Sequence, residues 1–457
     1  MKYSVSKRFF AIVGSAFLGL STPAISETLA DALISGYENS GLLAQNRAVL
    51  RAADEDVALA VASLRPTLSY IATASRSPNA LNSFGDTSTA DLRVSLDWLL
   101  YDFGRSDLRQ LIAMETVLMT RDALVGVEQQ VLLSVVSAYM SVQRDREFVA
   151  LRQNNVRLIT QELRASRDRF NVGDVTRTDV SAAEARLALS RARLAASQGA
   201  LAASREAYLA AVGHYPSNLA QPPVAPALAS SVEEAREIAL RTHPDILQAQ
   251  RAVTVRELGY QQAQASRRPT LNLSAQAGIN HRGTDTRSAT VTLSGPIYQG
   301  GQIASAERQA VANRDAARAN LYVVGQNVTR SIGTAWADLA VARAQIEASR
   351  RQIRAARTAF EGFREEATLG ARTTLDVLNA EQELLDAEAN LLSAQSDAQI
   401  AAYAVLSSMG LLTASHLGLG IQEYDPSDYY NAVRLAPHGQ ISEQGQRLDS
   451  VLERLGR

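Results

Sequence analysis

Two stretches of the chain alternate between apolar and polar residues with a period of two. The first spans residues 66–101 and the second residues 269–298, and in each a polar loop separates two alternating runs. This period predicts β-strands with one apolar and one polar face, so each stretch is expected to be a β-hairpin. Strands of roughly ten residues with this pattern are typical of a transmembrane β-barrel. The alternative is a pair of half-buried hairpins in a soluble sheet.

The two faces can be assigned residue by residue. The apolar positions are Leu68, Tyr70, Ala72, Ala74, Leu92, Val94, Leu96 and Trp98 in the first hairpin and Leu271, Leu273, Ala275, Ala277, Ala289, Val291 and Leu293 in the second. The intervening positions are polar and include Arg93, Asp97 and Gln276. An apolar face toward lipid and a polar face toward a lumen would account for both sets.

A long proline-free interval follows each hairpin. No proline occurs between Pro78 and Pro216 or between Pro296 and Pro426, and both intervals are rich in Ala, Leu, Arg, Gln and Glu, which favour helix. A short segment with a glycine divides the first interval at 172–176 and the second at 369–372. Each interval therefore predicts a helical hairpin with a tight tip. Its first arm, roughly 67 residues, would reach about 100 Å, more than twice the thickness of a bilayer.

The chain is expected to be internally duplicated. Three glycines recur at one constant offset, since Gly104, Gly173 and Gly213 correspond to Gly301, Gly370 and Gly410. The expected division is a first repeat at 27–220, a proline-rich linker at 221–230, a second repeat at 231–420 and a polar C-terminal tail at 421–457. In each repeat a helical region precedes the two hairpins, and that of the first repeat is expected to divide at Gly41. The uncharged segment 398–422 is expected to be a buried packing helix.

Residues 1–26 have the features of a signal peptide. Lys2, Lys7 and Arg8 precede an apolar run, and small residues follow at Ala24 and Ser26, near which we expect cleavage. The chain contains no cysteine, which argues against a thioether lipid anchor and against disulfide bonds. Export without a lipid anchor is therefore expected. The small net charge of −1 gives no indication of a nucleic-acid partner.

The common catalytic motifs are missing from the sequence. It contains no Gly-x-Ser-x-Gly, no His-Glu-x-x-His and no Gly-x-x-x-x-Gly-Lys, and its five histidines are scattered. We therefore expect the protein not to be an enzyme and to bind neither a cofactor nor a metal.

Four strands are too few to close a barrel around a lumen. Open strand edges in hydrocarbon leave unpaired backbone groups that cost several kcal/mol each, so the strands must be shared among chains. Two chains would give eight strands filled by side chains, whereas three would give twelve strands and a water-filled pore. We therefore predict a mainly α-helical fold with a membrane β-barrel. In this homotrimer a 12-stranded barrel takes four strands from each chain.

The tip segments carry a family resemblance. Arg169-Phe170-Asn171-Val172-Gly173 with Thr178-Asp179-Val180, and residues 369–380, resemble the tips of the TolC-type outer-membrane channel family, which includes outer membrane efflux proteins and type I secretion outer membrane proteins. The resemblance covers essentially the whole mature chain. It implies an outer-membrane protein that projects into the periplasm, in which the barrel of the trimer is continuous with a long α-helical coiled-coil tunnel. It also implies two partners, a periplasmic adaptor and an inner-membrane pump of the ABC or proton-driven type.

The resemblance further implies gate residues near the tips. Asp179 and Arg372 match an acid and an arginine that link neighbouring coils at the closed entrance. Asp376 matches an acid of the constriction, where three copies would favour cations. Asn379 stands where the family often has a second acid, and Ala367 replaces an aromatic residue of the usual latch. The alternative for the three charged residues is a solvated helix face.

The tips are also the expected adaptor-docking sites. The residues are Val172, Gly173 and Asp174 in the first tip and Leu369, Gly370 and Ala371 in the second. The alternative for the glycines is a purely local role, ending a helix in the left-handed conformation. The two roles are compatible with each other.

The function implied by the resemblance is a passive exit duct that conducts substrate from the pump across the periplasm and the outer membrane. Residues 374–387 most resemble the branch that serves type I protein secretion, and we expect this cargo. One alternative is a multidrug efflux channel of the same family. Another, from a different class, is a periplasmic coiled-coil adaptor or structural protein, which would not explain four alternating strands in two copies.

Overall fold

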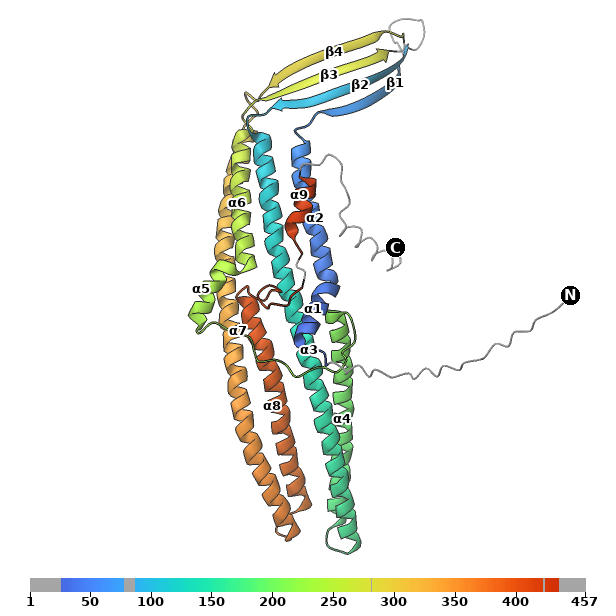
Figure 1. Ribbon diagram of the computed structural model, residues 1–457, viewed down its shortest axis with the longest axis vertical. Helices are drawn as coiled ribbons and strands as arrows, with labels where there is room; N and C mark the ends of the chain where they lie inside the picture. Colours follow the sequence, from blue (N-terminus) through green and yellow to red (C-terminus); the bar gives the residue numbers. More distant parts are fainter. Residues whose placement is uncertain (1–25, 78–86, 281, 422–423, 435–457) are drawn as a thin grey trace, which may run out of the picture.

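The computed structural model describes residues 26–77, 87–280, 282–421 and 424–434. Most of the predicted signal peptide, most of the predicted tail and the loop of the first β-hairpin lie outside these ranges. The described chain is elongated, with a four-stranded sheet at one end and the tips of two long helical hairpins at the other (Figure 1). Shorter helices lie alongside the middle and upper part.

The elements occur twice in the same order. The first series is α1 (Leu29–Asn39), α2 (Gly41–Ala62), β1 (Thr67–Ser77), β2 (Thr87–Tyr101), α3 (Arg105–Asn171) and α4 (Arg177–Val212). The second series is α5 (Val232–Thr242), α6 (Pro244–Ala265), β3 (Thr270–Asn280), β4 (Asp285–Ser294), α7 (Gln302–Thr368) and α8 (Thr374–Ser408), after which α9 (Pro426–Val433) follows. The predicted internal duplication is confirmed. The break before α2 also agrees with the division expected at Gly41.

The sheet is antiparallel with the strand order β1-β2-β3-β4, so β1 and β4 are its edges. Its registers place apolar residues opposite one another, since Leu68 faces Leu96 across β1 and β2 and Leu273 faces Val291 across β3 and β4. The expected apolar face thus extends over all four strands. In a single chain this face is bare, and Tyr70 is 82% exposed.

The opposite face of the sheet carries hydrogen-bonding side chains. The hydroxyl oxygens of Ser69 and Ser95 lie 2.7 Å apart, and Ser274 donates to Asp97 Oδ1 at 3.0 Å. A sheet with one apolar and one hydrogen-bonding face can separate lipid from an aqueous lumen.

Helices α3 and α7 are each 67 residues long and follow β2 and β4. Helix α3 supplies Val131, Leu132, Val135 and Tyr139 to the largest buried cluster, where side chains of α1, α4 and α8 meet them. Spacings of three and four residues place these side chains on one helix face. Among the described helices, α3 alone contains a stretch of 18 residues apolar enough to cross a membrane.

The helix expected over 398–422 is shorter than the sequence suggested. Helix α8 ends at Ser408, and Gly410 adopts a positive φ of 79°, a conformation in which glycine meets no steric penalty. The chain then turns toward α3, where the Ala414 N–H donates to Glu128 Oε1 at 2.7 Å. The uncharged composition indicated burial correctly, but it could not reveal the turn.

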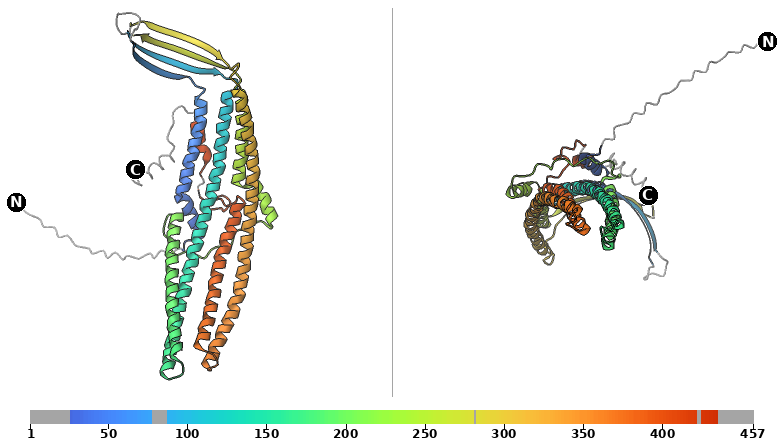
Figure 2. Two further views of the ribbon diagram at one scale, coloured as in Figure 1. Left: turned by 180° about the vertical axis from the view of Figure 1, so that it is seen from behind. Right: turned by 90° about the horizontal axis from the view of Figure 1, so that it is seen from below.

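Seen along its length, the helical part is a crescent-shaped wall (Figure 2). Helices α7 and α8 form one antiparallel pair and α3 and α4 form the other, while α8 packs against α3 and joins the pairs. Helix α6 packs between α3 and α7, in the part of the molecule that lies between the C-terminal end of α8 and the sheet. Helix α9, which falls within the predicted tail, packs on α2, and Tyr429 donates to Glu55 Oε1 at 2.5 Å.

Candidate gating and docking site

The turn between α3 and α4 and the turn between α7 and α8 have the same conformation. Gly173 and Gly370 have φ values of 81° and 77°. The N–H groups of Asp174 and Ala371 each donate to the carbonyl five residues earlier, at 2.9 Å in both turns. This hydrogen bond across a left-handed glycine is the Schellman ending of a helix. Both tip glycines therefore end a helix in the left-handed conformation, which is the local role expected as the alternative to adaptor docking.

One apolar side chain projects from each tip. Val172 is 81% exposed and Leu369 is 85% exposed. A Cβ atom placed on Gly173 or Gly370 would meet no atom of the described chain within 4 Å. The surfaces of both tips are thus open to a partner.

Asp179 and Asp376 occupy equivalent positions in the first turns of α4 and α8. Thr176 donates to Asp179 Oδ2 from its backbone nitrogen at 2.9 Å and from its hydroxyl at 2.7 Å. Thr373 does the same to Asp376 Oδ2, at 3.1 and 2.9 Å. These hydrogen bonds stabilise the charged carboxylates and lower the pKa of both groups. Both acids named as gate candidates therefore belong to capping boxes that begin their helices.

Arg372 is paired within its own hairpin. Its Nε lies 2.8 Å from Glu366 Oε2, and its guanidinium lies over the ring of Phe363, 4.6 Å from the centroid. The corresponding position in the first tip holds Val175, which is uncharged. Within the described chain the ion-pair partner of Arg372 is thus Glu366 and not Asp179.

Asn379 lies at the joint between the two helical hairpins. Its Oδ1 accepts a hydrogen bond from Arg186 Nη2 of α4 at 2.5 Å. Further along α8, Gln382 Oε1 accepts from Arg193 Nη1 at 2.6 Å. Neither arginine could be identified from the sequence, because the partners are 193 and 189 residues apart.

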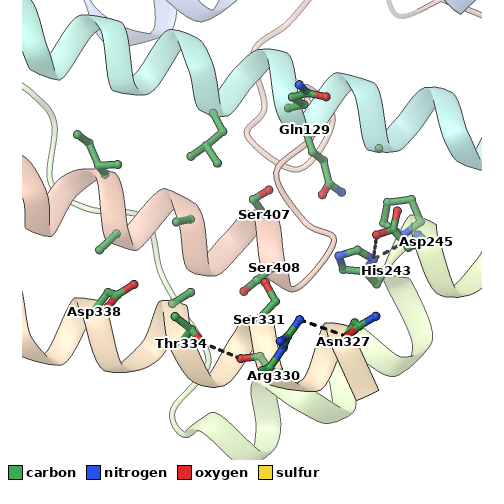
Figure 3. A pocket seen from close by; sticks show the side chains of 18 of the residues that line it. Gln129, His243, Asp245, Asn327, Arg330, Ser331, Thr334, Asp338, Ser407 and Ser408 are labelled. Carbon is green, nitrogen blue, oxygen red and sulfur yellow. Dashed lines mark hydrogen bonds and ion pairs between the residues drawn. The ribbon is translucent and has the colours of Figure 1, made fainter. Parts of the chain in front are cut away.

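A hollow of about 880 Å³, lined by both apolar and polar residues, opens higher in the wall, where α8 ends and α6 begins (Figure 3). Gln129 of α3 and Asn327 and Arg330 of α7 line it, and Arg330 Nη2 donates to Asn327 Oδ1 at 3.3 Å. His243 caps α6, since its Nδ1 accepts from the Asp245 N–H at 3.2 Å. Burial lowers the pKa of His243, in keeping with a neutral ring. Within the described chain no group of three side chains could hold a metal ion, here or elsewhere.

These features define a class of protein. A sheet with one lipid-compatible face, joined to long helical hairpins with open tips, is the subunit architecture of an outer-membrane channel that extends into the periplasm. The chain belongs to the outer membrane efflux protein family, whose sequence model matches residues 37–214 and 235–411. The matched segments fall in the two halves of the duplication. The protein is therefore an outer-membrane channel of this family, which contradicts the alternatives of a soluble sheet and a periplasmic adaptor.

Two relatives and one solved structure illustrate the similarity. The outer membrane efflux protein BepC of Brucella suis biovar 1 is 35% identical over 447 residues, which cover 95% of this chain and 97% of BepC. The alkaline protease secretion protein AprF of Pseudomonas aeruginosa is 26% identical, with 59% of each chain covered. The crystal structure of CusC has the same fold, with a TM-score of 0.75 at 18% identity over 84% of this chain and 92% of that chain.

Proposed function

We propose that three copies of this chain form a homotrimeric exit duct, in which the sheets close one barrel and the helical hairpins close a tunnel beneath it. The observation that carries this proposal is the pair of sheet edges, because in the described part of the chain β1 and β4 each pair with one strand only. A membrane does not tolerate such edges unless a neighbouring chain completes them. The crescent shape of the helical wall is consistent with one third of a ring (Figure 2).

In this proposal the tips form the periplasmic entrance and dock an adaptor, while an inner-membrane pump supplies the energy. The exposed side chains of Val172 and Leu369 are the apolar contacts offered to the adaptor. The remaining docking residues are Gly173, Asp174, Gly370 and Ala371.

The gate of the proposed duct combines a charged ring and an exchange of ion pairs. Three copies of Asp376 form a ring that favours cations, while Asn379, held by Arg186, adds no charge. On closure Arg372 exchanges Glu366 for Asp179 of the neighbouring subunit. An exposed pair is worth about 0–1 kcal/mol, so the exchange costs little and the gate depends on three copies acting together.

Efflux is the cargo class that similarity favours, because the likeness to BepC covers nearly the whole chain. Type I protein secretion is the second candidate. It is supported by residues 374–387 and by the partial likeness to AprF, a secretion protein by name.

The proposal is tested by inserting the purified protein into planar lipid bilayers and measuring conductance and ion selectivity. A water-filled, cation-selective pore is the expected result, whereas insertion without conductance would contradict the duct. The cargo is tested in a strain that lacks the gene. Increased sensitivity to toxic small molecules indicates efflux, and loss of a protein from the culture medium indicates secretion.

A further inference from the structure

A buried chain of hydrogen bonds joins α8 to the first helical hairpin, close to the tips. Asn155 of α3 donates from Nδ2 to Glu381 Oε1 of α8 at 3.1 Å, and Ser190 of α4 donates from its hydroxyl to Asn155 Oδ1 at 2.5 Å. Glu381 is only 6% exposed, Asn155 4% and Ser190 3%. Three different helices thus meet in one polar contact inside the wall.

An apolar cluster adjoins this contact. It consists of Ile159, Leu163, Ala183, Leu187 and Leu378. Leu378 of α8 is buried among side chains of α3 and α4, less than one helical turn before Glu381. The carboxyl group of Glu381 is therefore held where two helical hairpins pack together, away from solvent.

The described chain offers Glu381 no cation. The arginines on the facing helices contact other groups, since Arg186 binds Asn379, Arg193 binds Gln382, and Arg152 lies 3.9 Å from Asp386. Burial raises the pKa of Glu381 to about 7, the hydrogen bond from Asn155 opposes this shift, and the negative charge of Glu162 on α3 adds to it. Around neutral pH the group therefore changes between an uncharged and a charged form.

The equivalent position in the first repeat provides an internal comparison. Glu184 of α4 corresponds to Glu381 of α8 in the duplication. Its side chain is 49% exposed and forms an ion pair with Arg167 at 2.6 Å. An acid at this helical position is thus not inherently buried, and only the copy on α8 is enclosed without a counter-ion.

We infer that Glu381, Asn155 and Ser190 form a latch that holds α8 against the first helical hairpin, and that the latch is closed when Glu381 is uncharged. The inference rests on the proposed function, in which the helical hairpins separate at the entrance. Separation exposes Glu381 to water and breaks its contact with Asn155. Glu381 is a positioning residue, because it acts on the gate through the packing of α8.

The direction of the pH effect follows from linkage. In the packed joint the pKa of Glu381 is about 7, against 4.5 for the ordinary carboxyl group. Below about pH 4.5 both the packed and the separated arrangement keep the proton, so the latch is fully stable. Between the two values only the separated arrangement loses its proton, so rising pH favours separation. Above about pH 7 both are charged, and the destabilisation of the latch is complete.

The test compares wild type, Glu381→Gln and Glu184→Gln in planar bilayers between pH 5.5 and 7.5. For wild type we expect the ratio of open to closed channels to rise more than about tenfold over this range, since linkage allows up to about tenfold per pH unit between the two pKa values. Glu381→Gln keeps the acceptor for Asn155 and cannot ionise, so it should remain mostly closed with a flat profile. Glu184→Gln should retain the wild-type profile.

A third variant separates the latch from a general loss of structure. Asn155→Ala removes the partner of Glu381 and should raise the open ratio even at pH 5.5, while the detergent-extracted protein keeps the wild-type oligomeric mass. A wild-type pH response in Glu381→Gln, or a flat profile in Glu184→Gln, would overturn the latch. A wild type that does not conduct at any pH would contradict the proposed duct itself, so the two failures can be told apart.

Discussion

Asp179 and Asp376 make the same contacts in two copies of one turn, each accepting two hydrogen bonds from the threonine three residues before it. The lowered pKa of both groups means that these caps are present above the ordinary value of 3.8 and weaken only as the pH falls below it. Neither cap can therefore produce a response near neutral pH. The equivalence also provides a matched pair of variants.

Replacing Asp376 by Asn should lower the cation selectivity of the pore, whereas replacing Asp179 by Asn should leave it unchanged. Both substitutions weaken an equivalent capping box, but only Asp376 contributes to the proposed ring of negative charge. Reversal potentials in a salt gradient measure the effect. Equal loss of selectivity in both variants would mean that helix capping, and not a charged ring, is responsible.

Replacing Arg372 by Gln should raise the resting conductance a few-fold, because it removes the proposed link to Asp179 of the neighbouring subunit. Glu366→Gln is the control, since it frees Arg372 from its partner within the chain. This variant should conduct no more than wild type, because the freed guanidinium becomes available for the link. If both variants gave wild-type conductance, the link between subunits would not exist.

Replacing Leu369 by Ser should weaken crosslinking to the adaptor without affecting assembly. The side chain is almost fully exposed, so its loss removes little packing within the chain, and Val172→Ser tests the other tip in the same way. Normal crosslinking after both serine substitutions would exclude the tips as docking sites.

Replacing Val291 by Arg should prevent stable insertion into the outer membrane, whereas Thr290→Arg should be tolerated. The two residues are neighbours on β4 and lie on opposite faces, with Val291 on the apolar face shared with Leu273. An arginine at the middle of the lipid face costs about 2–4 kcal/mol, while a lumen-facing position has no such cost. Fractionation of membranes measures the outcome, and equal insertion of both variants would contradict the assignment of the faces.

Local periodicity was enough to predict much of this fold. The alternation around Tyr70 and Val291 identified both hairpins and their faces, because a strand reverses its side chains at every residue. The constant offset between Gly173 and Gly370 located both tips, since each turn requires a left-handed residue. These features depend only on neighbouring residues, so a single sequence contains them.

Contacts between distant segments could not be predicted in this way. Asn155 and Glu381 are 226 residues apart, and no local pattern distinguishes Glu381 from the exposed Glu184. The ion pair of Arg372 with Glu366 in its own hairpin was not predicted either. Burial of a polar side chain depends on how helices pack, and this is decided by the whole fold.

The most direct test is the mass of the protein extracted from outer membranes, measured by light scattering and corrected for bound detergent. A mass of three chains is expected, because the open edges of β1 and β4 need neighbours to complete the barrel. A monomer, or a dimer that is soluble without detergent, would contradict the shared barrel and with it the proposed duct.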